Sequence, residues 1–195
     1  MAWVELLGPD DVEGPAREMV DSGAAQYGQV LNTWAALLNR PEIFAAYLPF
    51  LRAVAGPGTL DPKVKDTSAF LVGVLNNCRY TVSHRAASAK RNGVDDEDLR
   101  RVAAHDWDGF DPTMQAVLAF TEQLTIRPDD LIYNEGPQVV DREILEALSA
   151  ELTDAQVVEL AMSVSVWNAL ARFHRVMGFE LDMPEPPAGT DPAEK

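Results

Sequence analysis

Five residues near the middle of the chain have side chains suited to thiol or acid/base chemistry: Asp66, Cys78, Thr81, His84 and Arg85. On a helix, Cys78, Thr81 and Arg85 share one stripe, because seven residues return to within roughly 20° of the start. A guanidinium near a thiol favours the thiolate and can hold an anion. Asp66, twelve residues before Cys78, is suited to act as a base or to orient Arg85. We therefore predict Asp66, Cys78, His84 and Arg85 as catalytic residues.

Residues around this group are expected to contact a substrate. Tyr80 and His84 form an i, i+4 pair on a face of their own. Asparagine is disfavoured inside an apolar helix, which makes Asn77 a candidate for a pocket wall. Each of these residues could instead have a purely structural role; Trp167, for example, could pack in the hydrophobic core. The predicted substrate-binding residues are Asn77, Tyr80, Thr81 and Trp167.

The helical segment that must position these residues is expected within 61–92. Asp61 is a good N-cap and Pro62 suits a first helical position. The segment lacks strand-like alternation and is too long for one strand. We predict one long helix or two abutting helices, ended by Asn92 and Gly93.

The rest of the chain also predicts helices and no strand. Apolar residues recur at helical spacing, and Gly or Pro separates the segments. The remaining longer predicted helices cover 29–39, 41–55, 113–126, 142–151 and 154–177, the last ended by Gly178, and 129–137 is a predicted loop. We predict an all-α fold with a single domain over 1–183. Residues 184–195 are Pro-rich and charged, which predicts a disordered acidic tail.

The composition narrows the classes of partner. Of the 195 residues, 47% are hydrophobic, enough for a sizeable core, and the formal net charge is -15. Such a charge repels phosphate backbones and anionic lipids, so we expect no nucleic acid and no membrane as partner. One cysteine excludes an intrachain disulfide and, without a recognisable signal peptide, suggests a cytoplasmic protein. No metal is expected at His105, because no second histidine is suitably spaced.

Residues 60–102 resemble the core of the carboxymuconolactone decarboxylase and alkylhydroperoxidase D (AhpD) family. That core has an acidic residue, then Cys-x-x-Cys-x-x-x-His, then Gly-hydrophobic-x-x-Glu-x-hydrophobic, which here is 93–99. Flanking segments extend the likeness over roughly 30–180. The resemblance implies an AhpD-like helical bundle that forms a homo-oligomer, as a dimer, trimer or hexamer.

The resemblance also assigns positions of the family motif. The acidic position falls on Asp66, the first cysteine on Cys78, the second on Thr81, and the histidine on Arg85, directly after His84. Thr81 cannot form the disulfide of the family's thiol peroxidases. The resemblance therefore implies acid/base and anion-binding chemistry more than a dithiol cycle.

Three functional hypotheses follow, none requiring a cofactor. The first is a cofactor-free lyase or isomerase for a small anionic or carbonyl-bearing molecule, with Arg85 holding the anion, Asp66 and His84 moving protons, and Cys78 lining the pocket. The second is a single-cysteine alkylhydroperoxidase or peroxiredoxin-like antioxidant enzyme, in which an external thiol restores oxidised Cys78. The third is a non-catalytic ligand-binding or scaffold member of the family.

Overall fold

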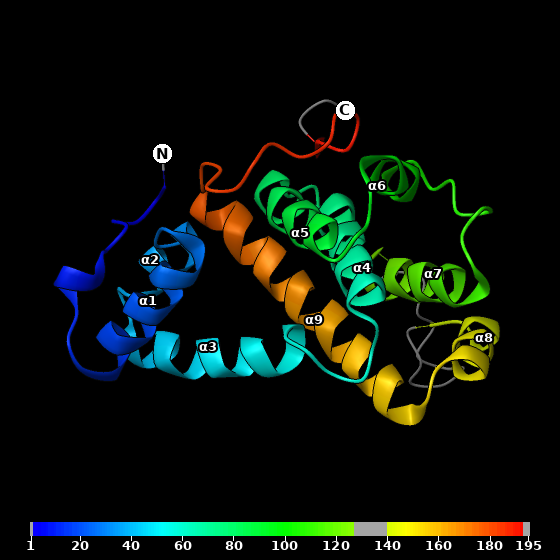
Figure 1. The fold of residues 1–195 in the computed structure, drawn as a ribbon, viewed down its shortest axis with the longest axis horizontal. Coiled ribbons are helices and arrows are strands. Elements are labelled where there is room, and N and C mark those ends of the chain that lie inside the picture. Colours follow the sequence, from blue (N-terminus) through cyan, green and yellow to red (C-terminus); the bar gives the residue numbers. More distant parts are fainter. Residues whose placement is uncertain (1, 127–139, 193–195) are drawn as a thin grey trace.

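The computed structural model describes residues 2–126 and 140–192, which form nine α-helices and no strand (Figure 1). The all-α prediction is confirmed, whereas the predicted loop at 129–137 lies outside the described residues. None of the described helices is long and apolar enough to cross a membrane. After a 3-10 turn at Pro9–Asp11, the helices are α1 (Gly14–Tyr27), α2 (Asn32–Leu37), α3 (Pro41–Ala55), α4 (Pro62–Leu75), α5 (Arg79–Arg91), α6 (Asp96–Ala103), α7 (Pro112–Ile126), α8 (Arg142–Glu151) and α9 (Asp154–Met177).

Helix α4 is the centre of the fold. Asp61 caps it by accepting a hydrogen bond from the backbone N–H of Lys63 at 2.7 Å, and Pro62 takes the first position, as predicted. Every residue from Lys65 to Val74 is buried. The helix packs against α5, α7 and α9. Side chains that leave α4 therefore start from a fixed backbone.

The segment 61–92 forms two helices joined by a tight turn. Asn77 lies in this turn with φ 52°, a left-handed conformation that asparagine adopts more readily than most residues. Gly73 lets the two helices approach closely, since a Cβ there would lie 3.0 Å from the backbone N of Val82. The turn folds α5 back along α4, which brings the end of α5 beside the start of α4.

The chain after α9 differs from the predicted disordered tail. Gly178 ends α9 with φ 65°, as predicted, and the following residues turn back over α5 (Figure 1). Ser83 Oγ donates to the carbonyl oxygen of Pro184 at 2.8 Å, and Thr190 and Asp191 are buried. The disorder prediction is therefore wrong for 184–192, because acidic side chains here have partners on α5. Residues 193–195 lie outside the described part.

Candidate functional site

A cavity of about 410 Å³ lies where α1, α2 and α3 meet α5 and α9. Its walls combine three aromatic side chains, Tyr27, Trp34 and Trp167, with two arginines, Arg52 and Arg85. The remaining lining residues are Gln26, Leu48, Leu51, Ala55, Gly56, Pro57 and Ser88. Aromatic walls with a few polar groups are typical of small-molecule sites.

Arg85 is the buried cation of this cavity. Its side chain is 12% exposed, and its Cζ lies 4.0 Å from the centre of the Trp167 ring. Nη1 donates to Oδ1 of Asp66 at 3.1 Å, while Nε is buried with no hydrogen-bond partner among the described residues. Burial lowers the pKa of Arg85, and the Asp66 carboxylate opposes that shift. The guanidinium keeps donors for an anion, since it has five N–H groups.

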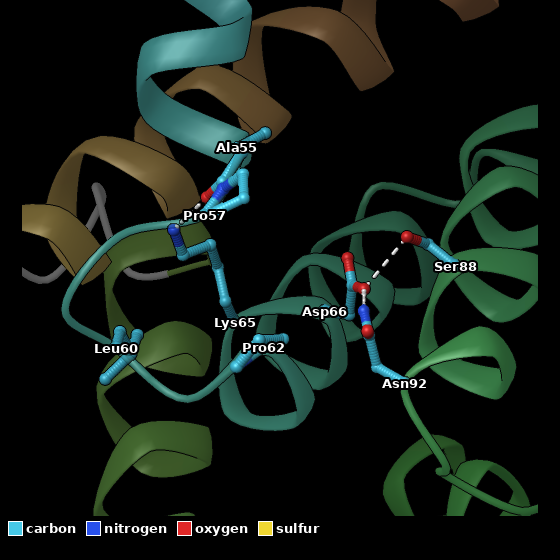
Figure 2. Close-up of a pocket in the computed structure, with 9 residues that line it drawn as sticks. Ala55, Pro57, Leu60, Pro62, Lys65, Asp66, Ser88 and Asn92 are labelled. Atoms are coloured by element: carbon cyan, nitrogen blue, oxygen red, sulfur yellow. Dashed lines mark hydrogen bonds between the residues drawn. The ribbon is translucent and has the colours of Figure 1, made fainter. Parts of the chain in front are cut away.

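Asp66, the partner of Arg85, lines a second, smaller cavity of about 160 Å³. Figure 2 shows its carboxylate directed toward Ser88 and Asn92. Oδ2 accepts hydrogen bonds from Ser88 Oγ at 2.8 Å and from Asn92 Nδ2 at 2.6 Å. Ser88 lines both cavities and therefore connects Asp66 with the larger one.

A buried ion pair fixes the loop shared by the two cavities. Lys65 of α4 pairs with Glu159 of α9 and donates to the carbonyl oxygen of Gly56 at 2.7 Å. Glu159 accepts hydrogen bonds from the backbone N–H and the hydroxyl of Thr59 at 2.7 and 2.8 Å. Burial raises the pKa of Glu159, but Lys65 and Thr59 outweigh it and bring that pKa to about 2. The loop is thus tied to two helices.

A separate polar cluster lies at the start of α5. Cys78 occupies the N-cap position and is 2% exposed. Thr81 Oγ1 donates to Cys78 Sγ at 3.2 Å and lies 2.9 Å from Nδ1 of His174. The other ring nitrogen of His174 lies 3.0 Å from Oγ1 of Thr33. Burial, followed by the charge of His84, lowers the pKa of His174 to about 3.

The segment after α9 closes this cluster. Asp182 Oδ1 lies 2.5 Å from Nε2 of His84, and Tyr80 donates its hydroxyl proton to Oδ2 at 2.7 Å. The rings of Tyr80 and His84 have centroids 4.3 Å apart, as the i, i+4 pairing predicts. Burial lowers the pKa of His84, although Asp182 opposes this. Burial raises the pKa of Asp182, but His84 and Tyr80 lower it overall.

The structure divides the predicted site residues into two groups and one outlier. The first group surrounds the two cavities and the second lies in the closed cluster: Asp66, Arg85 and Trp167 in the first, and Cys78, Tyr80, Thr81 and His84 in the second. Asn77 is exposed in the turn and lines neither cavity, so its placement inside a helix was wrong. The predicted stripe fails at Arg85, because Cys78 has extended backbone (φ -117°) and lies before the helix.

Several residues of both groups were not predicted. Ser88 and Asn92 could have been found from the sequence, because they follow Arg85 at i+3 and i+7 and so share its helical face. Trp34 and Asp182 give no local signal, since they reach their partners only through long-range packing. Within 2–126 and 140–192, no group of three or more His, Cys, Asp or Glu residues is placed to hold a metal ion.

The chain is similar to known proteins in part of its sequence and in its fold. Residues 41–123 match the carboxymuconolactone decarboxylase family. An uncharacterized peroxidase-related protein from Ralstonia eutropha JMP134 with an alkylhydroperoxidase AhpD core superposes with a TM-score of 0.78 at 16% identity, over 97% of this chain and 94% of that one. The apo debrominase Bmp8 superposes with a TM-score of 0.76 at 21% identity, over 97% of each chain. A cysteine-to-alanine variant of Bmp8 in complex with 2,3,4-tribromopyrrole gives 0.74 at 20% identity, over 97% and 94%. No curated protein matches the sequence.

The family match includes the central part of the site. It runs from the start of α3 into α7 and contains Lys65, Asp66 and Arg85. The structural likenesses cover nearly the whole chain and show the fold. Residues 41–123 are thus similar to the carboxymuconolactone decarboxylase family, and the chain has the all-α fold of AhpD-like proteins.

Proposed function

We propose that this protein is an enzyme that moves protons, without a bound cofactor, on a small anionic or carbonyl-bearing organic molecule in the Arg85 cavity. The reaction is of the lyase or isomerase type. The observation that carries the proposal is the Arg85 guanidinium, which is nearly buried on the cavity wall with one hydrogen bond to a carboxylate. A fixed cation in a desolvated site stabilises negative charge that develops on a bound molecule.

The size and walls of the cavity favour a flat organic anion. Its volume of about 410 Å³ suits a small molecule. Trp34 and Trp167 offer apolar ring surface, and Arg52 adds a second cation from α3. A planar ring compound, 2,3,4-tribromopyrrole, is bound by the Bmp8 variant of similar fold. This supports a ring-shaped substrate for the present chain.

Ser88 and Asp66 are the proposed proton carriers. A carbon next to a carbonyl gives its proton to Ser88 Oγ, while Ser88 passes its own proton to Asp66 across 2.8 Å. The C–H electron pair forms an enolate, and Arg85 binds its negative oxygen. Return of the proton to another carbon completes an isomerisation. In a decarboxylation, cleavage of the C–CO₂ bond forms the enolate, and a solvent-derived proton reaches it through the same two groups.

This assignment changes two roles that the sequence suggested. His84 and Cys78 belong to the closed cluster and line neither cavity. We therefore assign them no contact with the substrate, and Asp66 acts through Ser88 without His84.

Proton NMR in D₂O tests the proposal with a panel of 3-oxo and β,γ-unsaturated carboxylates. We expect the wild type to exchange deuterium into at least one compound or to convert it. Arg85→Gln should lower kcat/KM by about 100-fold, the typical effect of removing one charge-stabilising donor. Ser88→Ala should lower kcat with little change in KM. Arg100→Gln, an exposed arginine on α6, is the matched control and should behave as wild type.

The outcomes separate the hypotheses. Absence of exchange and conversion across the panel, together with absence of binding in calorimetry, overturns the proposal. Consumption of peroxide by the wild type and its loss in Cys78→Ser would instead establish the single-cysteine peroxidase.

A further inference from the structure

Tyr27 brings a second hydrogen-bond donor to the wall of the Arg85 cavity. It is the last residue of α1, and it lines the cavity together with Arg85 and Trp34. Tyr27 is 36% exposed, and within 2–126 and 140–192 no residue hydrogen-bonds to its hydroxyl. The hydroxyl is therefore available to donate to a molecule in the cavity.

The ring of Tyr27 is held by packing. It meets the ring of Trp34 edge-on, with centroids 5.5 Å apart and planes at 82°. Trp34 lies against the backbone of α1 at Gly23, one turn before Tyr27, where a Cβ would clash with the Trp34 ring. The position of the hydroxyl is thus set without a hydrogen bond inside the protein. All three residues precede 41–123, the segment that matches the family.

Tyr27 and Arg85 also interact through charge. Burial lowers the pKa of Arg85, and Asp66, followed by Tyr27, opposes that shift. Burial raises the pKa of Tyr47, a second tyrosine that interacts with the Arg85 charge, but Tyr47 does not line the cavity. Tyr27 is therefore the tyrosine that can reach a molecule bound to Arg85.

We propose that the Tyr27 hydroxyl donates a hydrogen bond to the same substrate oxygen that Arg85 binds, which makes Tyr27 a catalytic residue. This inference rests on the proposed function and adds a second donor to it. As Ser88 removes the proton, the C–H electron pair moves toward the carbonyl oxygen. Tyr27 keeps its own proton, and its hydrogen bond strengthens as the oxygen gains charge. A bond that strengthens in this way raises kcat.

Two donors on one oxygen narrow the class of substrate. The oxygen has to become negative in the reaction, and the ring surfaces of Trp34 and Trp167 in the cavity suit a planar molecule. A cyclic ketone satisfies both conditions when its enolate is conjugated with the ring. Such an enolate resembles a phenolate. A phenolate should therefore bind as a stable analogue of the intermediate.

Binding of 4-nitrophenolate to the full chain tests the role of Tyr27, at a pH at which the free phenol is ionised. Its visible absorption band moves to longer wavelength when the phenolate oxygen loses a hydrogen bond. We expect Tyr27→Phe to raise Kd by about 10-fold, the value of one hydrogen bond to a charged group. The band of its complex should lie at longer wavelength than that of the wild-type complex.

Turnover provides the second readout. For the compound that the wild type converts in D₂O, Tyr27→Phe should lower kcat by about 10-fold with little change in KM. Tyr80→Phe is the matched control, because the Tyr80 hydroxyl donates to Asp182 and Tyr80 lines neither cavity. This control should keep the wild-type Kd, band and kcat. Phenylalanine keeps the ring that packs on Trp34, so circular dichroism should show wild-type helicity for Tyr27→Phe.

The outcomes separate the role of Tyr27 from the proposed function. A wild-type Kd and band position in Tyr27→Phe would overturn the hydrogen bond, even where Arg85→Gln loses activity as expected. A wild type that binds no 4-nitrophenolate would overturn it as well. If the wild type converts no compound, the proposed function fails and the catalytic role of Tyr27 fails with it. A band difference that persists between the wild type and Tyr27→Phe identifies that case.

Discussion

Helix α5 carries two buried polar groups that differ in how fully their hydrogen bonds are used. In its second half, Arg85 faces a cavity, and Nε has no partner among the described residues. At its start, Thr81 contacts His174 of α9 and donates to the N-cap residue Cys78, and His84 pairs with Asp182 of the segment after α9. Both groups contain residue types that are suited to thiol or acid/base catalysis.

This difference in hydrogen bonding indicates which of the two groups is the better candidate for function. A closed network of satisfied hydrogen bonds stabilises the fold by itself. A buried donor without a partner costs about 1–3 kcal/mol, and its retention beside a cavity indicates a ligand that supplies the partner. The unused donors of Arg85 therefore weigh more than the chemically attractive thiol of Cys78. The following experiments test this contrast.

The largest expected effect comes from Asp66→Ala, which leaves a buried guanidinium without its carboxylate. We expect a loss of about 3–5 kcal/mol in the free energy of unfolding. Urea unfolding followed by tryptophan fluorescence measures it. The double variant Asp66→Leu/Arg85→Met should recover most of the loss, because neither charge remains. A loss below about 1 kcal/mol would show that the pair is solvated rather than buried.

Removal of the segment after Gly178 should open the closed cluster. We expect the rate of Cys78 alkylation to rise by about 100-fold. In the intact chain the covered thiol reacts only after local unfolding, and the truncation removes that cover. The signal is unambiguous, because the chain has one cysteine. The urea-unfolded chain gives the maximal rate. An unchanged rate, with helicity intact, would mean that the segment does not protect the thiol.

The closed cluster should also make stability depend on pH. The pKa of His174 is lowered to about 3, so between about pH 6.5 and 3 the unfolded state binds a proton that the folded state does not. Stability should therefore fall as pH falls from 6.5, with a slope of at most about 1.4 kcal/mol per pH unit per histidine. The lowered pKa of His84 acts in the same direction.

Measurements between pH 6.5 and 4.5 isolate the histidines, because the lowered carboxyl pKa of Glu159 matters only below that range. His174→Gln should flatten the urea-unfolding slope there. His105→Gln is the matched control, since His105 is 43% exposed and lies outside the cluster. If His174→Gln kept the full slope, the closed cluster would not be its source.

The smallest expected effect comes from Trp167→Phe. The smaller ring keeps an apolar wall but attracts the Arg85 cation less, so we expect a loss of about 0.5–1 kcal/mol in stability. Affinity for a bound anion should change by a few-fold at most. Thermal unfolding and calorimetry measure the two effects. A much larger loss would indicate that Trp167 supports α9 itself rather than the cation.

Local rules recovered most of the fold from the sequence. Asp61, Pro62 and Gly178 mark helix ends through capping and backbone preference, and these signals held in the structure. The tail was mispredicted because composition reports average solubility, whereas Glu185 and Asp191 both pair with Arg79 of α5.

The site was predicted only in part, for a related reason. Helical spacing placed Tyr80 beside His84 correctly, yet it assumed a continuous helix through Cys78. The turn at Asn77 places Cys78 before the helix and off the predicted stripe, while the expected contact of Asp66 with Arg85 is present at 3.1 Å. The aromatic walls of the cavity come from α1, α2 and α9, whose meeting no local pattern encodes.

The bond from Thr81 to Cys78 has a consequence for the neighbouring imidazole. A hydroxyl has one proton, and Thr81 gives its proton to the sulfur, so it can only accept from His174. Neutral His174 then carries its hydrogen on Nδ1, and Nε2 accepts from Thr33 Oγ1 at 3.0 Å, in competition with the longer contact of that hydroxyl to Tyr80 at 3.4 Å. Cys78 thereby selects one of the two tautomers of His174, although it contacts Thr81 and not the imidazole. The sulfur is the final acceptor of a one-way series of donors that begins at Thr33.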